Sequence, residues 1–472
     1  INTKLKELGF KNYKFDVVEH HHTHATSAFY QSGKKDALII TLDGSGDGLC
    51  GSVSIAQDTV IKRIGELTAD CSLGRVYSEI TRFLGFKRNR HEGKITGLAA
   101  YGDAKRLITH LSKFIRFNNE NLSFEWEIPK ESFIKRKIKT VKRILINENY
   151  GNPQQDYMHE YLVKNFDAKK DGNDLSASVQ KLTEDITVEL VEAYLKKYPN
   201  KNIVLAGGIF ANVRVNQCVG DIDGVEYVYV HQNMGDGGCA LGAALDSWSK
   251  LNAQQIPVLP NDVYYGPEYS NDEILKELKE TSGIEWTRSE NIEIDVAELI
   301  NNNKIVGRFS GKMEYGPRSL GNRSILAKTT DKTINDWLNE RLNRTEFMPF
   351  APAIYDKYAD DIFHNYNISS TKYASEFMTV TYNVKEKWVE QLQAAVHIDG
   401  TARPQVVTKN NNKKFHDILE HYYKMSGIPG VINTSFNTHE EPIVMTPNHA
   451  IKSLLQGTVD VLAIEDFLVK KK

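Results

Sequence analysis

The sequence has little cysteine, no long apolar run and almost no net charge. Its four cysteines among 472 residues are widely scattered and form no CxxC pair, which argues against a disulfide framework. No stretch approaches the ~20 apolar residues of a membrane span, and the opening INTKLKELGF lacks the apolar core of a signal peptide. The net charge of −2 argues against a general nucleic-acid-binding surface. These absences predict a cytoplasmic protein with neither a membrane nor a nucleic acid as partner.

Strands and helices alternate along the chain. Apolar runs at 36–43, 201–208 and 303–311 predict buried strands that end at glycine turns. The stretch 174–198 has a helical pattern that Asp174 or Ser176 could cap. Such alternation predicts an α/β fold. Because residues 252–272 hold three prolines and no helical period, we predict a first domain over 1–252, a linker over 253–272 and a second domain over 273–472.

Four histidines crowd into HHHTH at 20–24. His20 and His24 would share one helix face, although His21 is also three residues from His24 and leaves the pair ambiguous. Asp43 ends a predicted strand, and Asp236 precedes a glycine pair. Two imidazoles with carboxylates suit iron(II), manganese or zinc. The alternative is a polar helix surface with two turn-forming aspartates, and the spacing alone does not decide between them.

Glycine-rich turns mark two further places in the first half. LAGGIFANVRVN (205–216) joins a predicted strand to a predicted helix through a glycine pair. GDGGCALGAA (235–244) likewise has a glycine-rich turn before a predicted helix. Backbone N–H groups at such turns bind phosphate oxygens. Neither stretch matches a Walker A or dinucleotide motif. The candidate phosphate-binding residues are Gly207, Gly208, Asn212, Asn216 and Gly237.

Polar and basic residues recur at glycine-bounded positions in the second half. SGKMEYGPRSLGNRSILA (310–327), VHIDGTARPQVV (396–407) and GVINTSFN (430–437) carry them. Guanidinium groups and backbone N–H groups at glycine turns hold phosphate or carboxylate oxygens. Surface salt bridges and turns would explain any one stretch, but they explain the recurrence poorly. The candidate anion-binding residues are Lys312, Arg318, Asn322, Arg323, His397, Arg403, Asn433 and Ser435.

Several motifs, taken in order, resemble one known family. They include HHHTHATSAF, TLDGSGDG, EGKITGLAAYGD, KMEYGPRSLGNRSILA, EFMPFAPAI, HIDGTARPQ and NTSFNTHEEPIV. Together they resemble the O-carbamoyltransferases of the NodU/CmcH type over nearly the whole chain. The resemblance implies an N-terminal actin-like domain, similar to that of threonylcarbamoyl-transferring enzymes, followed by a YrdC-like α/β domain.

The resemblance also implies a chemistry. Carbamoyl phosphate and ATP would give carbamoyladenylate in the second domain, and the carbamoyl group would pass to a small-molecule hydroxyl at a metal site in the first. His20, His24, Asp43 and Asp236 would be iron ligands, which selects His20 over His21. His21 and Asp47 become candidate general bases. Phosphate and adenylate contacts would come from Lys312, Arg318, Arg323, Arg344, Arg403, Asn322, His397, Asn433 and Ser435, with Arg318 and Arg323 in catalytic roles.

Two departures from the family pattern stand out. In LNRTEFMPFAP (342–352), Asn343 and Met348 occupy positions that are often basic, while Arg344 remains. The chain also begins close before the histidine motif, so we expect that an N-terminal segment of the family is absent. A tRNA-modifying threonylcarbamoyl activity and a catalytically decayed regulatory relative are the alternatives, and homo-oligomerisation is left open. The near-neutral charge argues against tRNA.

Overall fold

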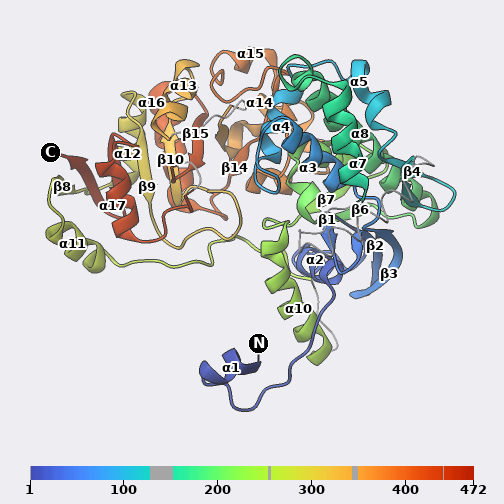
Figure 1. The fold of residues 1–472 in the computed structure, drawn as a ribbon. Coiled ribbons are helices and arrows are strands. Elements are labelled where there is room, and N and C mark those ends of the chain that lie inside the picture. The colour runs from blue at the N-terminus through green and yellow to red at the C-terminus, as the bar shows by residue number, and fades with distance from the viewer. Residues whose placement is uncertain (1, 128–152, 253–256, 343–348, 439–440) are drawn as a thin grey trace, which may run out of the picture.

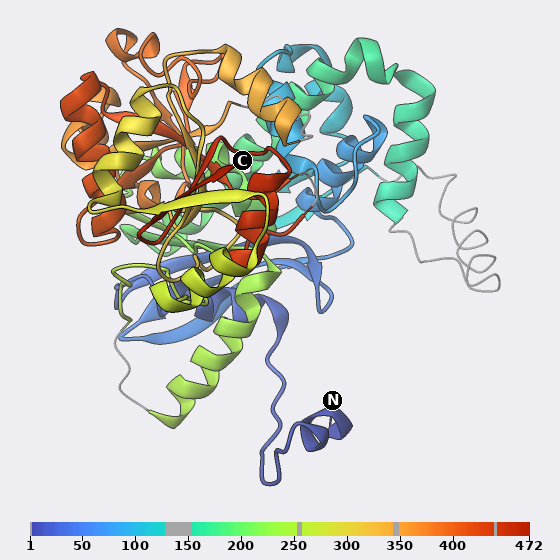
Figure 2. The same ribbon diagram turned by 90° about the vertical axis from the view of Figure 1, so that its left-hand side faces the viewer.

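The structure is a computed structural model that describes residues 2–127, 153–252, 257–342, 349–438 and 441–472. Its fold is α/β, as predicted: helices cover two large sheets, one from each half of the chain (Figure 1). None of the described helices is both long and apolar enough to cross a bilayer. Helix α1 (Asn2–Glu7) lies away from the rest of the chain in both views (Figures 1 and 2).

The first sheet has five strands in the order β3-β2-β1-β6-β7. Strand β1 lies at its centre, antiparallel to β2 and parallel to β6. The carboxyl ends of β1, β6 and β7 therefore meet at one edge, where ligand sites of α/β sheets are usually found. The strands are β1 (Ala37–Gly46), β2 (Leu49–Gln57), β3 (Val60–Thr68), β6 (Asn202–Ala206) and β7 (Tyr227–Val230). The actin-like assignment of this half stays a prediction.

The second sheet has eight strands in the order β14-β11-β15-β10-β9-β16-β17-β8. Strands β9, β10 and β15 lie inside it, and their side chains are almost all buried. The strands are β8 (Ile284–Arg288), β9 (Val306–Phe309), β10 (Arg323–Ala327), β11 (Ala351–Tyr355), β14 (Gln405–Val407), β15 (Gly430–Ser435), β16 (Val461–Ile464) and β17 (Phe467–Lys471). Two-stranded ribbons are β4 (Arg116–Asn118) with β5 (Ser123–Glu125), and β12 (Tyr382–Asn383) with β13 (Thr401–Ala402).

The remaining elements are helical. The α-helices are α2 (His20–Phe29), α3 (Leu73–Phe83), α4 (Glu92–Ala99), α5 (Ala104–Leu111), α7 (Pro153–Asn165), α8 (Ala168–Lys197), α9 (Val213–Gly220), α10 (Cys239–Leu251), α11 (Asn271–Glu280), α12 (Ile292–Asn301), α13 (Thr333–Arg341), α14 (Ala359–Ile362), α15 (Glu386–Val389), α16 (Lys413–Ser426) and α17 (Pro447–Leu455). The 3₁₀ turns are η1 (Gly208–Ala211), η2 (Asp236–Gly238), η3 (Asp356–Tyr358), η4 (Tyr366–Ile368) and η5 (Tyr373–Phe377).

The predicted strands at 36–43, 201–208 and 303–311 are confirmed as β1, β6 and β9. The predicted cap of the long helix is wrong. Helix α8 begins at Ala168, and its N-cap is Asp167, whose side chain accepts hydrogen bonds from the N–H groups of Lys169 and Lys170. The polar residues 168–173 carry no apolar period, so the pattern alone places the start of the helix too late.

The two halves of the chain contact each other through hydrogen bonds to backbone carbonyl oxygens. The N–H of Val228 in β7 donates to the carbonyl oxygen of Ser370 at 2.8 Å. The amide of Asn216 in α9 donates to the carbonyl oxygen of Thr379 at 2.7 Å. Residues 257–270 contain no helix or strand, yet the Tyr264 hydroxyl donates to the carbonyl oxygen of Leu320. The predicted domain boundaries stay a prediction.

Candidate active site

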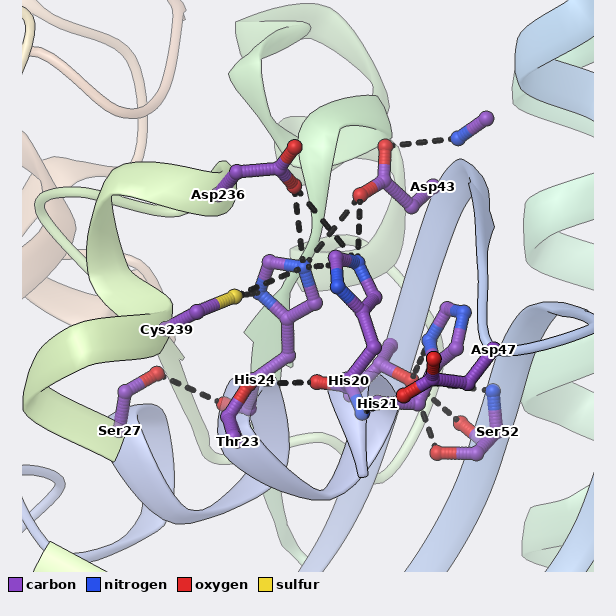
Figure 3. Close-up of polar contacts among 12 residues, drawn as sticks. His20, His21, Thr23, His24, Ser27, Asp43, Asp47, Ser52, Asp236 and Cys239 are labelled. Carbon is purple, nitrogen blue, oxygen red and sulfur yellow. Dashed lines mark hydrogen bonds and ion pairs between the residues drawn. The ribbon is translucent and has the colours of Figure 1, made fainter. Parts of the chain in front are cut away.

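Helix α2 brings two histidines together at its first turn. The helix is capped by Glu19, whose carboxylate accepts hydrogen bonds from the N–H groups of His21 and His22 at 3.0 and 2.8 Å. The next turn places His24 beside His20, with 3.2 Å between their Nε2 atoms. His24 is fully buried, whereas the His20 side chain keeps 20% exposure. The pair expected from the resemblance therefore shares one face of the helix (Figure 3).

Two carboxylates meet this pair from the ends of two strands. Asp43 lies in β1, and its Oδ2 is 3.2 Å from His20 Nε2 and 3.3 Å from His24 Nε2. Asp236 follows β7 in η2, and its Oδ1 is 3.6 and 3.7 Å from the same two nitrogens. The structure thus gathers all four residues predicted as metal ligands, from three separate segments (Figure 3).

The electrostatics of this cluster are strongly coupled. Burial lowers the pKa of His24, but hydrogen bonds to Asp236 and Asp43 outweigh it and raise the pKa to about 11. Burial raises the pKa of Asp43, but hydrogen bonds to His20 and His24 hold it well below its usual range. In the absence of an ion, the ionised Asp43 carboxylate and the protonated imidazoles therefore stabilise one another's charge.

The same atoms could hold a divalent cation. Ligand atoms 2.0–2.2 Å from an ion in a tetrahedral site lie about 3.4 Å from one another. The separations of 3.2 to 3.7 Å between the imidazole nitrogens and the carboxylate oxygens are close to that value. Imidazole and carboxylate together suit iron, manganese and zinc. The residues present fit the group that the resemblance implies.

His21 and Asp47, the two predicted bases, make other contacts here. His21 is fully buried, and its Nδ1 lies 2.9 Å from Thr41 Oγ1. Burial lowers the pKa of His21 to about 4, so its ring is neutral near pH 7. Asp47 is exposed, and its Oδ2 accepts a hydrogen bond from the N–H of His20 at 2.9 Å. Neither group lines the cavity beside the histidine pair, and their role as general bases stays a prediction.

A cavity of about 790 Å³ opens in front of the two carboxylates. Asp43 and Asp236 form one end of its wall, and Arg318 from the second half of the chain also lines it. A second cavity of about 310 Å³ shares Arg318 with the first and is also lined by Arg403, Asn433 and Ser435. A third, of about 220 Å³, shares Arg403 and adds His397. All three cavities also share Thr96, and residues from both halves line each of them. They therefore adjoin one another between the halves, and we call them the row of cavities.

Two polar atoms in this row of cavities await a partner. The Asn433 amide nitrogen donates to Gln405 at 2.7 Å, while its buried Oδ1 has no hydrogen-bond partner among the described residues. His397 Nδ1 lies 3.3 Å from Asp399 Oδ1. The buried Nε2 of His397 also has no hydrogen-bond partner among the described residues. Buried polar atoms are nearly always satisfied. These two are therefore suited to contact a polar ligand.

Arg323 and Asn322 are placed differently from the predicted anion site. Arg323 is fully buried. Its guanidinium lies 3.6 Å from the ring centre of Phe309 and donates to four backbone carbonyl oxygens, those of Ser310, Gly311, Asn322 and Pro267. The amide of Asn322 donates to the carbonyl oxygen of Lys312 at 2.8 Å. Neither has a group directed to the row of cavities, so both hold the loop instead. Their binding roles find no support in this geometry.

Lys312 and Arg344 also lie outside the row of cavities as described. Lys312 is exposed and lines a separate, open cavity with Tyr264 and Asn412. It does not contribute to the wall that Arg318 forms. Arg344 lies outside the described residues, as do Asn343 and Met348. Of the predicted basic residues that the structure describes, only Arg318 and Arg403 line the row of cavities.

The predicted phosphate loops split into lining and structural residues. Gly208 and Asn212 line the large cavity. Gly207 has φ +103, and a Cβ there would lie 2.1 Å from the Leu42 carbonyl oxygen, so its role is the close approach of β6 to β1. Asn216 is fully buried and donates to the carbonyl oxygen of Phe210. Gly237 does not line the cavity.

Two residues at the site gave no clear sequence signal. Cys239 begins α10, and its Sγ lies 3.7 Å from His24 Nε2. Cys239 follows the predicted ligand Asp236 by three residues, and this spacing is the sequence feature that could have indicated that it lies near the cluster. Arg75 in α3 lines the large cavity and donates to Ser45 Oγ at 2.8 Å. The segment SLGRVY contains it, but nothing in that segment distinguishes it from a surface arginine.

Comparison with known proteins gives a consistent picture. Family models described as the N-terminus and C-terminus of carbamoyltransferases match residues 3–245 and 297–471. An uncharacterised protein of Methanocaldococcus jannaschii is 33% identical over 99% of this chain and 86% of its own length. Nodulation protein NolO of Bradyrhizobium diazoefficiens is 30% identical over 96% of this chain and 79% of its own.

Among solved structures, full-length HypF in a phosphate- and nucleotide-bound form covers 53% of this chain and 45% of its own. The identity is 17% and the TM-score 0.29. A likeness this weak supports no conclusion about fold or function.

Proposed function

The chain belongs to the carbamoyltransferase family, and from this premise we propose that it activates carbamoyl phosphate with ATP and transfers the carbamoyl group to a hydroxyl of a small-molecule acceptor. The observation that carries the proposal is the row of cavities between the halves. It links the histidine–aspartate cluster at one end with Arg318, Arg403 and Asn433 further along. A candidate anion-binding region and a candidate metal region therefore line adjoining cavities.

Activation takes place, in this proposal, in the second cavity. Water first hydrolyses carbamoyl phosphate to carbamate and inorganic phosphate. The carbamate oxygen then attacks the α-phosphorus of ATP, pyrophosphate leaves, and carbamoyladenylate forms. Arg318 and Arg403 line this space and neutralise the phosphate charge. The unpartnered Oδ1 of Asn433 is suited to accept a hydrogen bond from the carbamoyl NH₂.

Transfer follows at the histidine–aspartate end. The acceptor hydroxyl loses its proton to solvent, its oxygen bonds to the carbamoyl carbon, and AMP leaves as the bond between that carbon and the adenylate oxygen breaks. His20, His24, Asp43 and Asp236 would hold the divalent ion, iron(II) by resemblance, which stabilises negative charge on the reacting oxygens. Arg75 lines the same wall and can orient an anionic group of either substrate. Since carbamoyladenylate would hydrolyse in open water, a walled path between the two ends is useful.

The location proposed for the protein is the cytoplasm. All four cysteines are unpaired in the structure, and two of them, Cys50 and Cys71, are buried. Unpaired thiols are typical of a reducing compartment.

The proposal is tested by following [¹⁴C]carbamoyl phosphate. The protein, ATP and a desalted small-molecule extract are incubated together, and labelled products are separated by chromatography. We expect label in a small molecule only when ATP is present. Arg318→Ala is expected to abolish labelling. Arg288→Ala is the matched control and is expected to keep it, because Arg288 is exposed and pairs with Asp466 away from the cavities. Labelling without ATP would contradict the adenylate route.

A further inference from the structure

Cys239 lies where the histidine–aspartate cluster meets helix α10. It is the first residue of that helix, three positions after Asp236. Its Sγ lies 3.7 Å from His24 Nε2 and 3.9 Å from His24 Nδ1. Figure 3 shows the sulfur beside the His24 ring, on the side away from Asp43. The thiol therefore belongs to the same group of side chains as the predicted metal ligands.

The backbone holds Cys239 firmly against the histidine helix. Gly242, one turn further along α10, packs on α2 so closely that a Cβ there would lie 1.9 Å from the Thr23 carbonyl oxygen. The Thr26 hydroxyl donates to the carbonyl oxygen of Gly242 at 2.9 Å. Because both contacts join α10 to α2, the separation of Cys239 from His24 is set by the fold. A side chain on a packed helix is a precise place for a ligand.

The donor atoms form a compact set of mixed chemistry. One nitrogen each from His20 and His24, one oxygen from Asp236 and the sulfur of Cys239 all lie within 4.8 Å of one another. The sulfur is 3.7 Å from His24 Nε2, close to the separation of about 3.6 Å expected between a sulfur and a nitrogen that bind one tetrahedral ion. Sulfur, nitrogen and oxygen donors together are characteristic of sites for zinc, cobalt or iron rather than magnesium or calcium.

We propose that Cys239 supplies a thiolate ligand, beside His20, His24, Asp43 and Asp236, to the divalent ion that these residues would hold. On binding, the thiol proton is lost to solvent and a sulfur–metal bond forms, with no change in oxidation state. The proposal rests on the metal site of the proposed function and adds a ligand that neither the sequence motifs nor the family assignment required. Its consequence is selectivity: a soft donor favours zinc, cobalt or iron(II) over manganese.

The test is cobalt(II) spectroscopy on the full chain. The protein is stripped of metal with a chelator, dialysed and titrated with Co²⁺. We expect a near-ultraviolet sulfur-to-cobalt charge-transfer band in the unmodified protein, with its loss in Cys239→Ser. Cys218→Ser is the matched control and keeps the band, because Cys218 lies in α9 near Glu184 and Arg214. Circular dichroism establishes that each variant is folded.

The outcomes separate this proposal from the one on which it rests. Visible cobalt bands without the charge-transfer band would show an ion bound by nitrogen and oxygen alone, which overturns the cysteine ligand and keeps the metal site. No cobalt bands at all would overturn both. A second readout is metal preference. We expect Cys239→Ser to weaken Zn²⁺ binding at least about tenfold while Mn²⁺ binding changes by less than about twofold. Equal losses for both ions would indicate a merely structural role and overturn the ligand.

Discussion

Arg323 is expected to be a structural residue, and its replacement tests that conclusion. Its guanidinium is fully buried and donates to four backbone carbonyl oxygens at 3.0 to 3.1 Å. Arg323→Met keeps most of the side-chain length but removes the guanidinium donor from all four oxygens. The carbonyl oxygens of Asn322 and Pro267 still accept from the N–H groups of Ser310 and Met313. Hydrogen bonds from charged groups contribute about 1.5–3 kcal/mol each, offset by the cost of burying the charge. Each buried carbonyl oxygen left unsatisfied costs about 1–3 kcal/mol.

The assay is urea unfolding followed by tryptophan fluorescence, since Trp286 and Trp337 lie in the same half of the chain. The midpoint is expected to fall strongly for Arg323→Met. Arg288→Met is the control: this arginine is exposed and pairs with Asp466 at 3.2 Å, so a loss of about 1 kcal/mol or less is expected. An unchanged midpoint together with lost activity would refute the structural role and restore the phosphate-binding role expected from the sequence.

Two other predictions concern the elements that carry the site. Gly207→Ala is expected to lower the free energy of unfolding by about 3 kcal/mol or more, because its Cβ would lie 2.1 Å from the Leu42 carbonyl oxygen. The control is Gly224→Ala, which should cost only about 1 kcal/mol, because Gly224 has φ +84 and no neighbour within 4 Å of its Cβ position. Similar thermal melting temperatures of the two variants would contradict the steric explanation. His21→Asn is expected to make the free energy of unfolding depend less steeply on pH in the acid range. Because burial lowers the pKa of His21 from 6.5 to about 4, the unfolded chain binds more protons between those values. His21 therefore contributes stability that is fully present above about pH 6.5 and is lost as the pH falls to about 4, by about 3 kcal/mol. Unfolding measured across this pH range checks it, and an unchanged slope in the variant would count against it.

The sequence predicted the histidine–aspartate cluster well because its members follow local rules. His20 and His24 are one helical turn apart. Asp43 lies near the carboxyl end of β1, and Asp236 follows β7, which is close to β1 in the sheet. Spacing and strand ends therefore locate them before any tertiary contact is known. The choice of His20 over His21 came from the resemblance, and the orientation of His21 toward Thr41 is consistent with it.

The anion-binding residues were harder to predict because their roles depend on side-chain direction. Arg318 and Arg323 lie in one glycine-rich loop, yet Arg318 faces the cavity and Arg323 turns inward onto Phe309. Lys312 precedes both and lines a different cavity. Residue type and glycine spacing are alike for all three, so only the packing of the loop separates them. The contact of Cys239 with His24 was not predicted for a related reason, because the two residues are 215 positions apart in the sequence.

The most direct measurement is pyrophosphate release from ATP and carbamoyl phosphate without any acceptor, in the unmodified protein, Arg318→Ala and His20→Ala. We expect pyrophosphate release that needs both ATP and carbamoyl phosphate. The release should be lost in Arg318→Ala and persist in His20→Ala, because activation and transfer take place at different ends of the row of cavities. Release that is lost equally in His20→Ala would contradict that division. No release from the unmodified protein under any metal condition would contradict the proposed activity itself.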